Sequence, residues 1–319
     1  MESNVECVPN FSTSDNAAID AITAAFGGGG VWLLDQGSDL DHERSVVTAA
    51  GYPGPMMRAM EAATEAAIEH IDMRSQRGRH PRLGAVDVVP FVPLGATTMA
   101  DCVEGARDFA ATIAERLQLP VYLYAEAALR PERRVLADIR QPGFEGLEQA
   151  MATAAHVPDF GPARPHPTAG AAAVGARPFL IAFNIQLSTT DVAVARRIAT
   201  AIRERDGGLP GVQALGIDLA SQGCVQLSLN VLDHGRTPLW RVWEEAQRLA
   251  LREGVSVLDS ELIGLAPALA LTEVADHIGV ASARPLEERI GEAAAWLRIR
   301  TFEPSMAFEL RLAHARAAH

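Results

Sequence analysis

The residues best suited to chemistry lie around one histidine. His80 is part of the segment 74–94, RSQRGRHPRLGAVDVVPFVPL, whose apolar, β-branched second half predicts a buried strand. A loop that enters a buried strand is held by the sheet, and the proline after His80 favours an extended backbone, so the ring can keep one orientation for acid/base catalysis. Arg77, Arg79 and Arg82 favour a neutral imidazole near pH 7, which suits a base or an anion site. A structural role for this histidine is the alternative that its surroundings leave open.

Two other groups of residues invite different chemistry. The four glycines 27–30 follow a predicted helix and precede a predicted strand, which is the reverse of the order in a dinucleotide-binding loop, so we favour a turn. Asp39, Asp41, His42 and Glu43 have the close spacing of metal ligands. Because no second cluster completes a metal site, an acidic turn is the simpler interpretation, and we expect no metal.

Composition narrows the function classes. The formal net charge of −12 argues against nucleic acid as a partner. The sequence contains no lysine, so all 28 basic side chains are arginine, which excludes a pyridoxal phosphate anchor and a P-loop lysine. Arginine forks remain, and they suit carboxylates and phosphates.

Cysteine usage and hydropathy point to a cytoplasmic protein. Cys7, Cys102 and Cys224 are far apart and odd in number, so they predict buried thiols and neither disulfides nor a metal knuckle. No apolar stretch is long enough for a membrane span, and the N-terminus MESNVECVPN lacks a basic region followed by an apolar one. We therefore expect no membrane partner.

Hydrophobic patterns predict the elements that hold these residues. In the first half we expect strands at 5–8, 31–34, 45–48, 85–94 and 121–124 and helices at 15–26, 53–71 and 98–117. In the second half we expect strands at 179–187, 212–219, 225–232 and 255–258, helices at 189–205 and 237–252, and two further helical patterns at 268–278 and 285–297. Both halves read β-α-β-β-α-β. This order predicts an α+β fold of two ferredoxin-like subdomains, 1–160 and 161–319, with a cleft between them.

The connection between the two halves is a candidate ligand loop. Residues 158–178 are rich in Pro, Gly and Ala and show neither a strand nor a helix pattern. Prolines stiffen the stretch GPARPHPTAG, and its glycines permit close approach of a flat ligand at a subdomain boundary. The candidate positions are Gly161, Pro162, Ala163, Arg164, Pro165, His166, Pro167, Thr168, Ala169 and Gly170.

Several segments together resemble one enzyme family. The stretch around His80 is similar to the signature HPRxGAxDvxPFxP of glutamate formimidoyltransferases, and the resemblance covers about residues 1 to 267. The other matching segments are VECVPNFS at 5–12, PVYLY at 120–124, PDFGP at 158–162, VGARPFLIAFNIQL at 174–187 and CVQLSLNVLD at 224–233. The resemblance is to the stand-alone form of the family, without a cyclodeaminase domain.

The resemblance implies a folate-dependent one-carbon transferase of histidine metabolism. In that reaction N5 of tetrahydrofolate attacks the amidine carbon of N-formimidoylglutamate, and glutamate leaves from a tetrahedral intermediate. His80 matches the family's catalytic histidine, Arg44 and Arg82 match arginines that hold carboxylates, and the loop 161–170 matches a folate site. Asp41 and Arg79 complete the expected substrate site. The family also implies a homodimer, tetrahydrofolate as co-substrate, and neither a metal nor pyridoxal phosphate.

The chain departs from the family pattern around the expected donor site. Gly37 stands where the family has an aspartate that orients the histidine, Arg79 replaces an acidic residue, and Glu43 replaces an asparagine. The first two changes move the local charge by about three units toward positive. We therefore expect N-formimidoylglutamate to be a poor substrate, unless Asp39 or Asp41 supplies the missing carboxylate. The alternatives are a paralogue that transfers a formyl group or acts on another amine, and a non-catalytic folate- or metabolite-binding protein.

Overall fold

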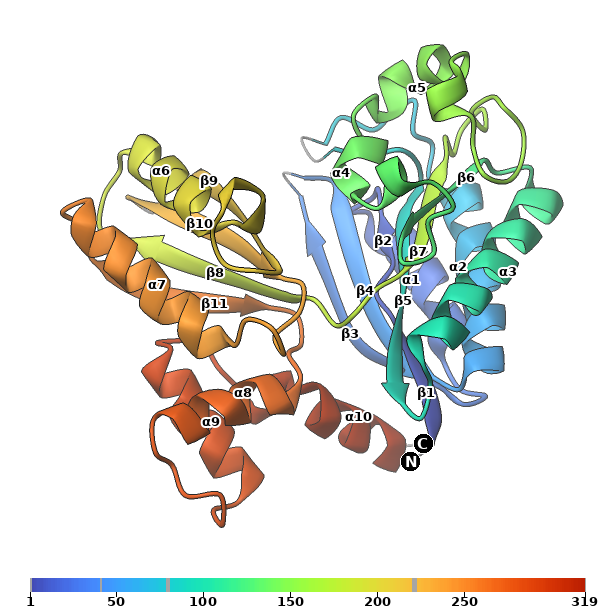
Figure 1. The fold of residues 1–319 in the computed structure, drawn as a ribbon. Coiled ribbons are helices and arrows are strands. Elements are labelled where there is room, and N and C mark those ends of the chain that lie inside the picture. Colours follow the sequence, from blue (N-terminus) through green and yellow to red (C-terminus); the bar gives the residue numbers. More distant parts are fainter. Residues whose placement is uncertain (1, 41, 79–80, 220–222, 319) are drawn as a thin grey trace. The chain divides into compact units, whose positions relative to one another are not determined.

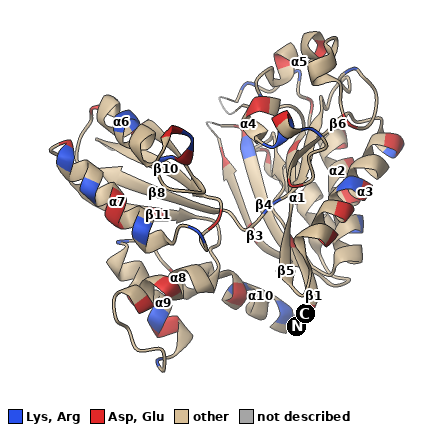
Figure 2. Ribbon diagram, viewed as in Figure 1, with Lys and Arg blue, Asp and Glu red and all other residues tan. Residues whose placement is uncertain are grey.

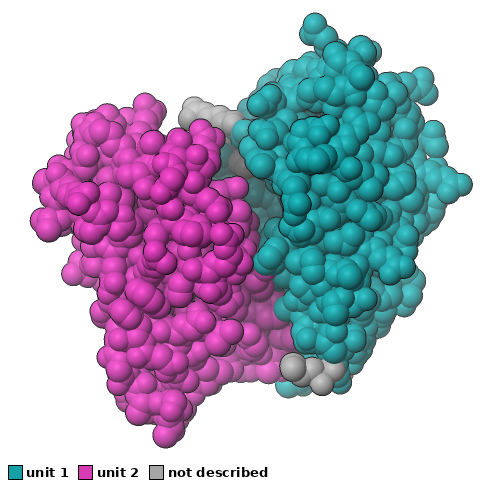
Figure 3. Space-filling view, viewed as in Figure 1, with its two compact units in different colours: residues 1–178, 315–319 teal, residues 179–314 magenta. Residues whose placement is uncertain are grey.

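The computed structural model describes residues 2–40, 42–78, 81–219 and 223–318. The chain forms two compact units, Met1–Pro178 with Ala315–His319, and Phe179–His314 (Figure 3). Each unit has its own sheet, which confirms the mixed α+β class. The division falls after residue 178 and not after the expected residue 160, because the strand at 172–176 pairs within the first sheet.

The first unit is built on a mixed sheet. Its strands are β1 (Ser3–Cys7), β2 (Asn10–Phe11), β3 (Val31–Asp39), β4 (Arg44–Gly51), β5 (Val86–Gly95), β6 (Val121–Ala125) and β7 (Ala172–Ala176). The order is β1-β4-β2-β5-β7-β6, with β3 paired to the other side of β4 (Figure 1). Both β1 and β2 pair with β4 and with β5, and these pairs are antiparallel, whereas β5, β7 and β6 run parallel.

Three amphipathic helices cover one face of this sheet. They are α1 (Asn16–Thr23), α2 (Pro53–His70) and α3 (Met99–Leu117) (Figure 1). Apolar residues spaced by three and four face the core, for example Cys102, Ala106 and Phe109 of α3. A capping box begins α3, because the Thr98 side chain accepts from the backbone of Asp101 and the Asp101 side chain accepts from the backbone of Thr98.

The opposite face of the first sheet is partly covered by α4 (Leu136–Ile139) and α5 (Gly143–Met151) (Figure 1). Ile139, Leu147 and Met151 pack with Tyr122 and Tyr124 in a small separate core. The sequence patterns indicated neither these helices nor β7. The expectation that 158–178 contains no strand is wrong, because β7 lies between β5 and β6, where neighbours on both sides supply its hydrogen bonds.

The glycine run forms the expected turn. Gly28, Gly29 and Gly30 have φ angles of +93°, +64° and +89°, a conformation that favours glycine. They connect the end of the first helical segment to β3. A turn between a helix and a strand is therefore confirmed at this position.

The second unit has a fully antiparallel sheet. Its strands are β8 (Ile181–Leu187), β9 (Val212–Leu219), β10 (Cys224–Val231) and β11 (Val257–Ile263), in the order β11-β8-β10-β9. Its helices are α6 (Val192–Ile202), α7 (Leu239–Arg252), α8 (Ala268–His277) and α9 (Leu286–Trp296), and α10 (Phe308–Ala317) ends in the segment that belongs to the first unit. Trp243 of α7 is 1% exposed in the core.

Charged residues lie mostly on the helices and loops, and the strands are mainly uncharged (Figure 2). Within the described ranges, none of the helices combines the length and the apolar character that a membrane crossing needs.

Candidate active site

The backbone just before the expected catalytic histidine is held by one carboxylate. Glu43 Oε2 accepts from the N–H groups of Arg77 and Gly78 at 2.7 and 3.0 Å. Gly78 approaches the β3–β4 connection so closely that a Cβ would lie 2.1 Å from the carbonyl oxygen of His42. Three predicted site residues lie outside the described part of the chain, namely Asp41, Arg79 and His80.

The residues just after the histidine are held as firmly. Arg82 Nη2 donates to the Gln76 carbonyl oxygen at 3.1 Å and to Glu145 Oε1 of α5 at 2.9 Å, and the Arg82 side chain is 11% exposed. The Leu83 N–H donates to Asp87 Oδ1 at 2.9 Å. Both flanks of the histidine are therefore anchored by carboxylates that come from outside the segment 76–83.

The end of the predicted folate loop lies against the same segment. The Ala85 N–H donates to the Ala169 carbonyl oxygen at 3.0 Å, and Gly84 pairs with Gly170. A Cβ on Gly84 would lie 2.2 Å from the Ala169 oxygen, so only glycine fits here without a shift. The structure thus brings the last residues of the loop 161–170 to the signature segment, where Ala169 and Gly170 are buried.

His166 organises that loop through its ring. Its Nδ1 accepts from the Ala169 N–H at 3.1 Å, and its backbone exchanges two hydrogen bonds with Gly170 at 2.8 and 3.0 Å. Burial lowers the pKa of His166, which fits a ring nitrogen that acts as an acceptor. Ala163 and Arg164 are exposed in the same loop and remain accessible to a ligand.

Arg44 begins β4, and its Nη2 donates to Asn10 Oδ1 of β2. The pKa of Arg44 is lowered to about 10, mainly by burial and also by the positive charge of Arg140, whereas Asp87 and Asp39 oppose the shift. A guanidinium in such a position is held close to other charges and away from bulk water.

Two charged residues near Arg44, namely Asp87 and Arg140, were not among the predicted site residues. Asp87 stands out in the sequence as a carboxylate within the apolar run VDVVPFV, and it is 2% exposed. That contrast was available from the sequence alone. Arg140 follows α4, a helix that no pattern indicated, so nothing marked it in advance.

Residues of the acidic turn contact one another and the segment before His80. His42 Nδ1 lies 2.8 Å from Asp39 Oδ2, and the Glu43 carboxylate holds the backbone of the segment before His80. Among the residues with described positions, no three His, Cys, Asp or Glu side chains are grouped as metal ligands.

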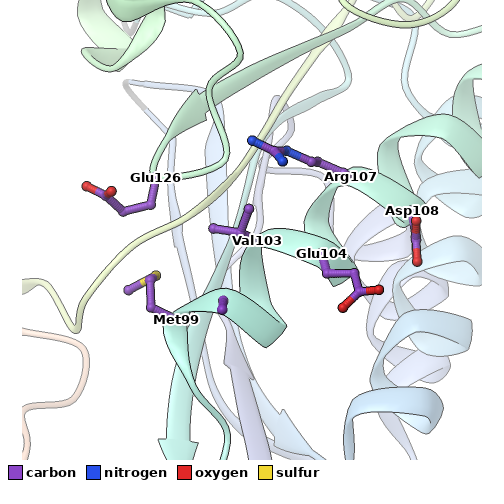
Figure 4. A pocket seen from close by; sticks show the side chains of 7 residues that line it. Met99, Val103, Glu104, Arg107, Asp108 and Glu126 are labelled. Atoms are coloured by element: carbon purple, nitrogen blue, oxygen red, sulfur yellow. The ribbon is translucent and has the colours of Figure 1, made fainter.

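Two surface hollows of the first unit lie on α3. The first, of about 370 Å³, is shown in Figure 4, where Met99, Val103 and Arg107 lie on the side of α3 toward Glu126 while Glu104 and Asp108 point away. It contains none of the predicted site residues. The second, of about 490 Å³, includes Gly161 and Pro162 of the predicted folate loop.

Comparison with known proteins decides the family. Residues 4–177 match the formiminotransferase domain, N-terminal subdomain, and residues 182–289 match the formiminotransferase domain. The chain belongs to the formiminotransferase family. It is 42% identical over 279 residues to a glutamate formimidoyltransferase of Streptococcus pyogenes, and the matched region covers 87% of this chain and 93% of that protein. It is 43% identical over 298 residues to a glutamate formimidoyltransferase of Thermoplasma acidophilum, which covers 91% and 98%. A formimidoyltransferase-cyclodeaminase of Rattus norvegicus is 42% identical over 283 residues, which is 86% of this chain and 52% of the rat protein.

Membership in the formiminotransferase family confirms the expected enzyme class, a transferase. Ser12 and Asp15, which follow β2, each make a hydrogen bond that fixes the chain locally. Asp15 caps α1 by accepting from the Ala18 N–H at 3.0 Å, and Ser12 Oγ donates to the Gly84 carbonyl oxygen at 2.7 Å. At Gly37 of β3 a Cβ would meet no atom within 4 Å, so this position has room for a side chain.

Proposed function

We propose that this formiminotransferase moves a formimidoyl group between N-formimidoylglutamate and tetrahydrofolate. The observation that carries the proposal is 42–43% identity, over about nine-tenths of the chain, to two proteins named glutamate formimidoyltransferase. The arrangement of the first unit supports it, because buried or half-buried arginines gather beside the signature segment, where a substrate with two carboxylates needs cations.

The reaction forms a bond between N5 of tetrahydrofolate and the amidine carbon and breaks the bond from that carbon to the glutamate nitrogen. N5 gives up a proton, and the leaving nitrogen gains one. In the proposal His80 carries both transfers, first as base and then as acid. Arg44 and Arg82 hold donor carboxylates, and Arg79 and Asp41 are included in the proposed substrate site because the sequence predicts them there.

The remaining finer features belong to the same proposal. Each half is a ferredoxin-like subdomain, which the strand orders β3-β4-β1-β5 and β9-β10-β8-β11 support. Folate binds in a cleft beside residues 161–170; the hydrogen bond from the Ala85 N–H to the Ala169 carbonyl oxygen supports this by holding the loop against the signature segment. The enzyme acts as a homodimer in the cytoplasm, as its family resemblance implies.

Two measurements test the proposal. Tetrahydrofolate or a stable formyl analogue should quench tryptophan emission or raise the melting temperature by mass action. Incubation of both substrates should yield glutamate and 5-formimidoyltetrahydrofolate in equal amounts. Absence of any binding signal near millimolar folate, together with no glutamate release, would refute the proposed function.

The departures at Gly37 and Arg79 define the competing possibility of a different donor. A kcat/KM for N-formimidoylglutamate of about 10⁴ M⁻¹s⁻¹ or more is the usual enzyme range and supports the proposed donor. A value far below that range, raised by the double variant Gly37→Asp and Arg79→Glu, supports a donor without a cationic amidinium. The open space at Gly37 makes this variant a mild structural change.

A further inference from the structure

A bulge in β5 turns one buried carboxylate out of the regular strand pattern. Asn10 of β2 pairs with Val88 and Phe11 pairs with Val86, so the register passes over Asp87. Val86 belongs to the core under the large helices, whereas Val88 belongs to the small core beneath α4 and α5. A bulge of this kind redirects a side chain, and such bulges are common beside active sites.

Asp87 uses its two oxygens for two different anchors. Oδ1 accepts from the Leu83 N–H at 2.9 Å, three residues beyond His80, and Oδ2 accepts from Arg140 Nη2. The Arg140 side chain is 13% exposed, and its Nε is buried with no acceptor within the described ranges. Asp87 therefore fixes the Arg140 guanidinium and leaves one of its donors unsatisfied.

Arg44 lies on β4, and β2 pairs with both β4 and β5. Its Nη2 donates to Asn10 Oδ1, and Asn10 pairs with Val88, the residue after Asp87. The positive charge of Arg140 contributes to the lowered pKa of Arg44, so the two guanidinium groups repel each other electrostatically. Two like charges in a poorly hydrated region are costly, and an anion between them would relieve that cost.

We propose that Arg140, held by Asp87 beside Arg44, binds one carboxylate of the amino-acid donor and is a specificity-determining residue of this transferase. The inference rests on the proposed function for the identity of the donor. A guanidinium fork matches a carboxylate bidentately. The donor is the better occupant than the folate tail, because its α-carboxylate lies two bonds from the reacting nitrogen and Asp87 anchors the segment next to the catalytic histidine.

The test compares variants of Arg140 with a control variant at Arg134, which also lies between β6 and β7. Arg140→Gln should raise the KM for the donor by roughly one to two orders of magnitude, as expected for a lost hydrogen bond to a charged group, and leave the KM for folate unchanged. Arg140→Lys should recover only part of the loss because the fork is gone. Arg134→Gln removes an exposed arginine paired with Glu126 and should change neither KM.

A binding measurement separates this inference from the proposed function. Glutarate, a dicarboxylate without the reacting group, is titrated calorimetrically into the wild type and each variant, and circular dichroism checks the fold. If Arg140→Gln does not fold with Asp87 unpaired, the double variant Asp87→Asn with Arg140→Gln, which carries no buried charge at either position, replaces it.

Each outcome bears on the proposed function, on the carboxylate site at Arg140, or on both. Arg140-dependent glutarate binding by a protein that does not turn over N-formimidoylglutamate refutes the proposed function and supports the carboxylate site. Normal turnover with an unchanged donor KM in the folded variant overturns the carboxylate site alone. A raised folate KM with an unchanged donor KM, or no glutarate binding by the wild type, also overturns it.

Discussion

Four strands of the first sheet, β3-β4-β1-β5, have the same order as the four strands of the second sheet, but the two units differ in how deeply their ion pairs are buried. In the first unit β1 lies between β4 and β5, and in the second β8 lies between β10 and β11. Among the described residues of the first unit, two ion pairs have both side chains at most 13% exposed, Arg133–Asp159 and Arg140–Asp87. In the described part of the second unit every ion pair has one side chain that is at least 32% exposed.

The difference teaches that the strand order does not require buried charge. Taking both ions of a pair out of water costs several kcal/mol each, and apolar residues of similar volume often serve as well. The second unit folds around an apolar core in which Trp243 is buried. The buried pairs of the first unit therefore mark places where a particular geometry has been kept at a cost in stability.

The two buried pairs have different partners. Arg133 donates to the carbonyl oxygens of Ala155 and Val157, and Asp159 accepts from the Leu123 N–H at 2.8 Å. This pair therefore holds the segment between β6 and β7 against β6. The Asp87 pair instead holds the backbone beside His80. The first is structural, and the second belongs to the candidate site.

The largest contrast between the units is expected in catalysis. His80→Ala should lower turnover by roughly two to four orders of magnitude with folding and folate affinity nearly unchanged, as for a general acid/base. His314→Ala, at an exposed position of the second unit, should leave turnover unchanged. Steady-state rates with both variants check this. Retention of more than about a tenth of the activity in His80→Ala would assign the proton transfer to another residue.

A second contrast concerns stability. Arg133→Met leaves Asp159 as an uncompensated buried charge and should lower the free energy of unfolding by about 3–5 kcal/mol. Arg197→Met in the second unit breaks an exposed pair with Glu253 and should produce no measurable change. Urea unfolding followed by circular dichroism measures both. Equal losses would show that burial does not distinguish the two pairs.

Replacing a glycine with alanine should change the stability in opposite directions in the two units. Gly84→Ala would place a Cβ 2.2 Å from the Ala169 oxygen and should destabilise by about 1–3 kcal/mol, as overpacking does. Gly291→Ala in α9 meets no atom within 4 Å and should stabilise by about 0.5–1 kcal/mol through helix propensity. Thermal unfolding midpoints compare the pair. A stable Gly84→Ala would mean that the contact between the signature segment and the loop 161–170 is loose.

The sequence predicted what depends on local pattern. Amphipathic spacing located α2, α3 and α7, and the apolar run after His80 located β5. It missed β7, because a strand of alanine, valine and glycine has no recognisable pattern and forms only between two neighbours. The same distinction between local and long-range contacts applies to the residues of the candidate site. Arg82 is close to His80 in the sequence and was predicted, whereas Arg140 meets Asp87 across 53 positions and was not.

The smallest effect concerns His166, the polar anchor of the loop in the first unit. Burial lowers its folded-state pKa below the unfolded value of about 6.5, so the neutral ring is favoured in the folded protein. Its contribution to stability is therefore fully present above pH 6.5 and is lost as the pH falls through the folded pKa, because the unfolded chain binds the proton first. Protonation also removes the Nδ1 acceptor of the Ala169 N–H. His166→Asn keeps an acceptor oxygen that does not titrate, so its melting temperature should fall less between pH 7 and pH 5 than that of the wild type. Parallel curves for the two proteins would show that the ring is not what makes the loop sensitive to acid.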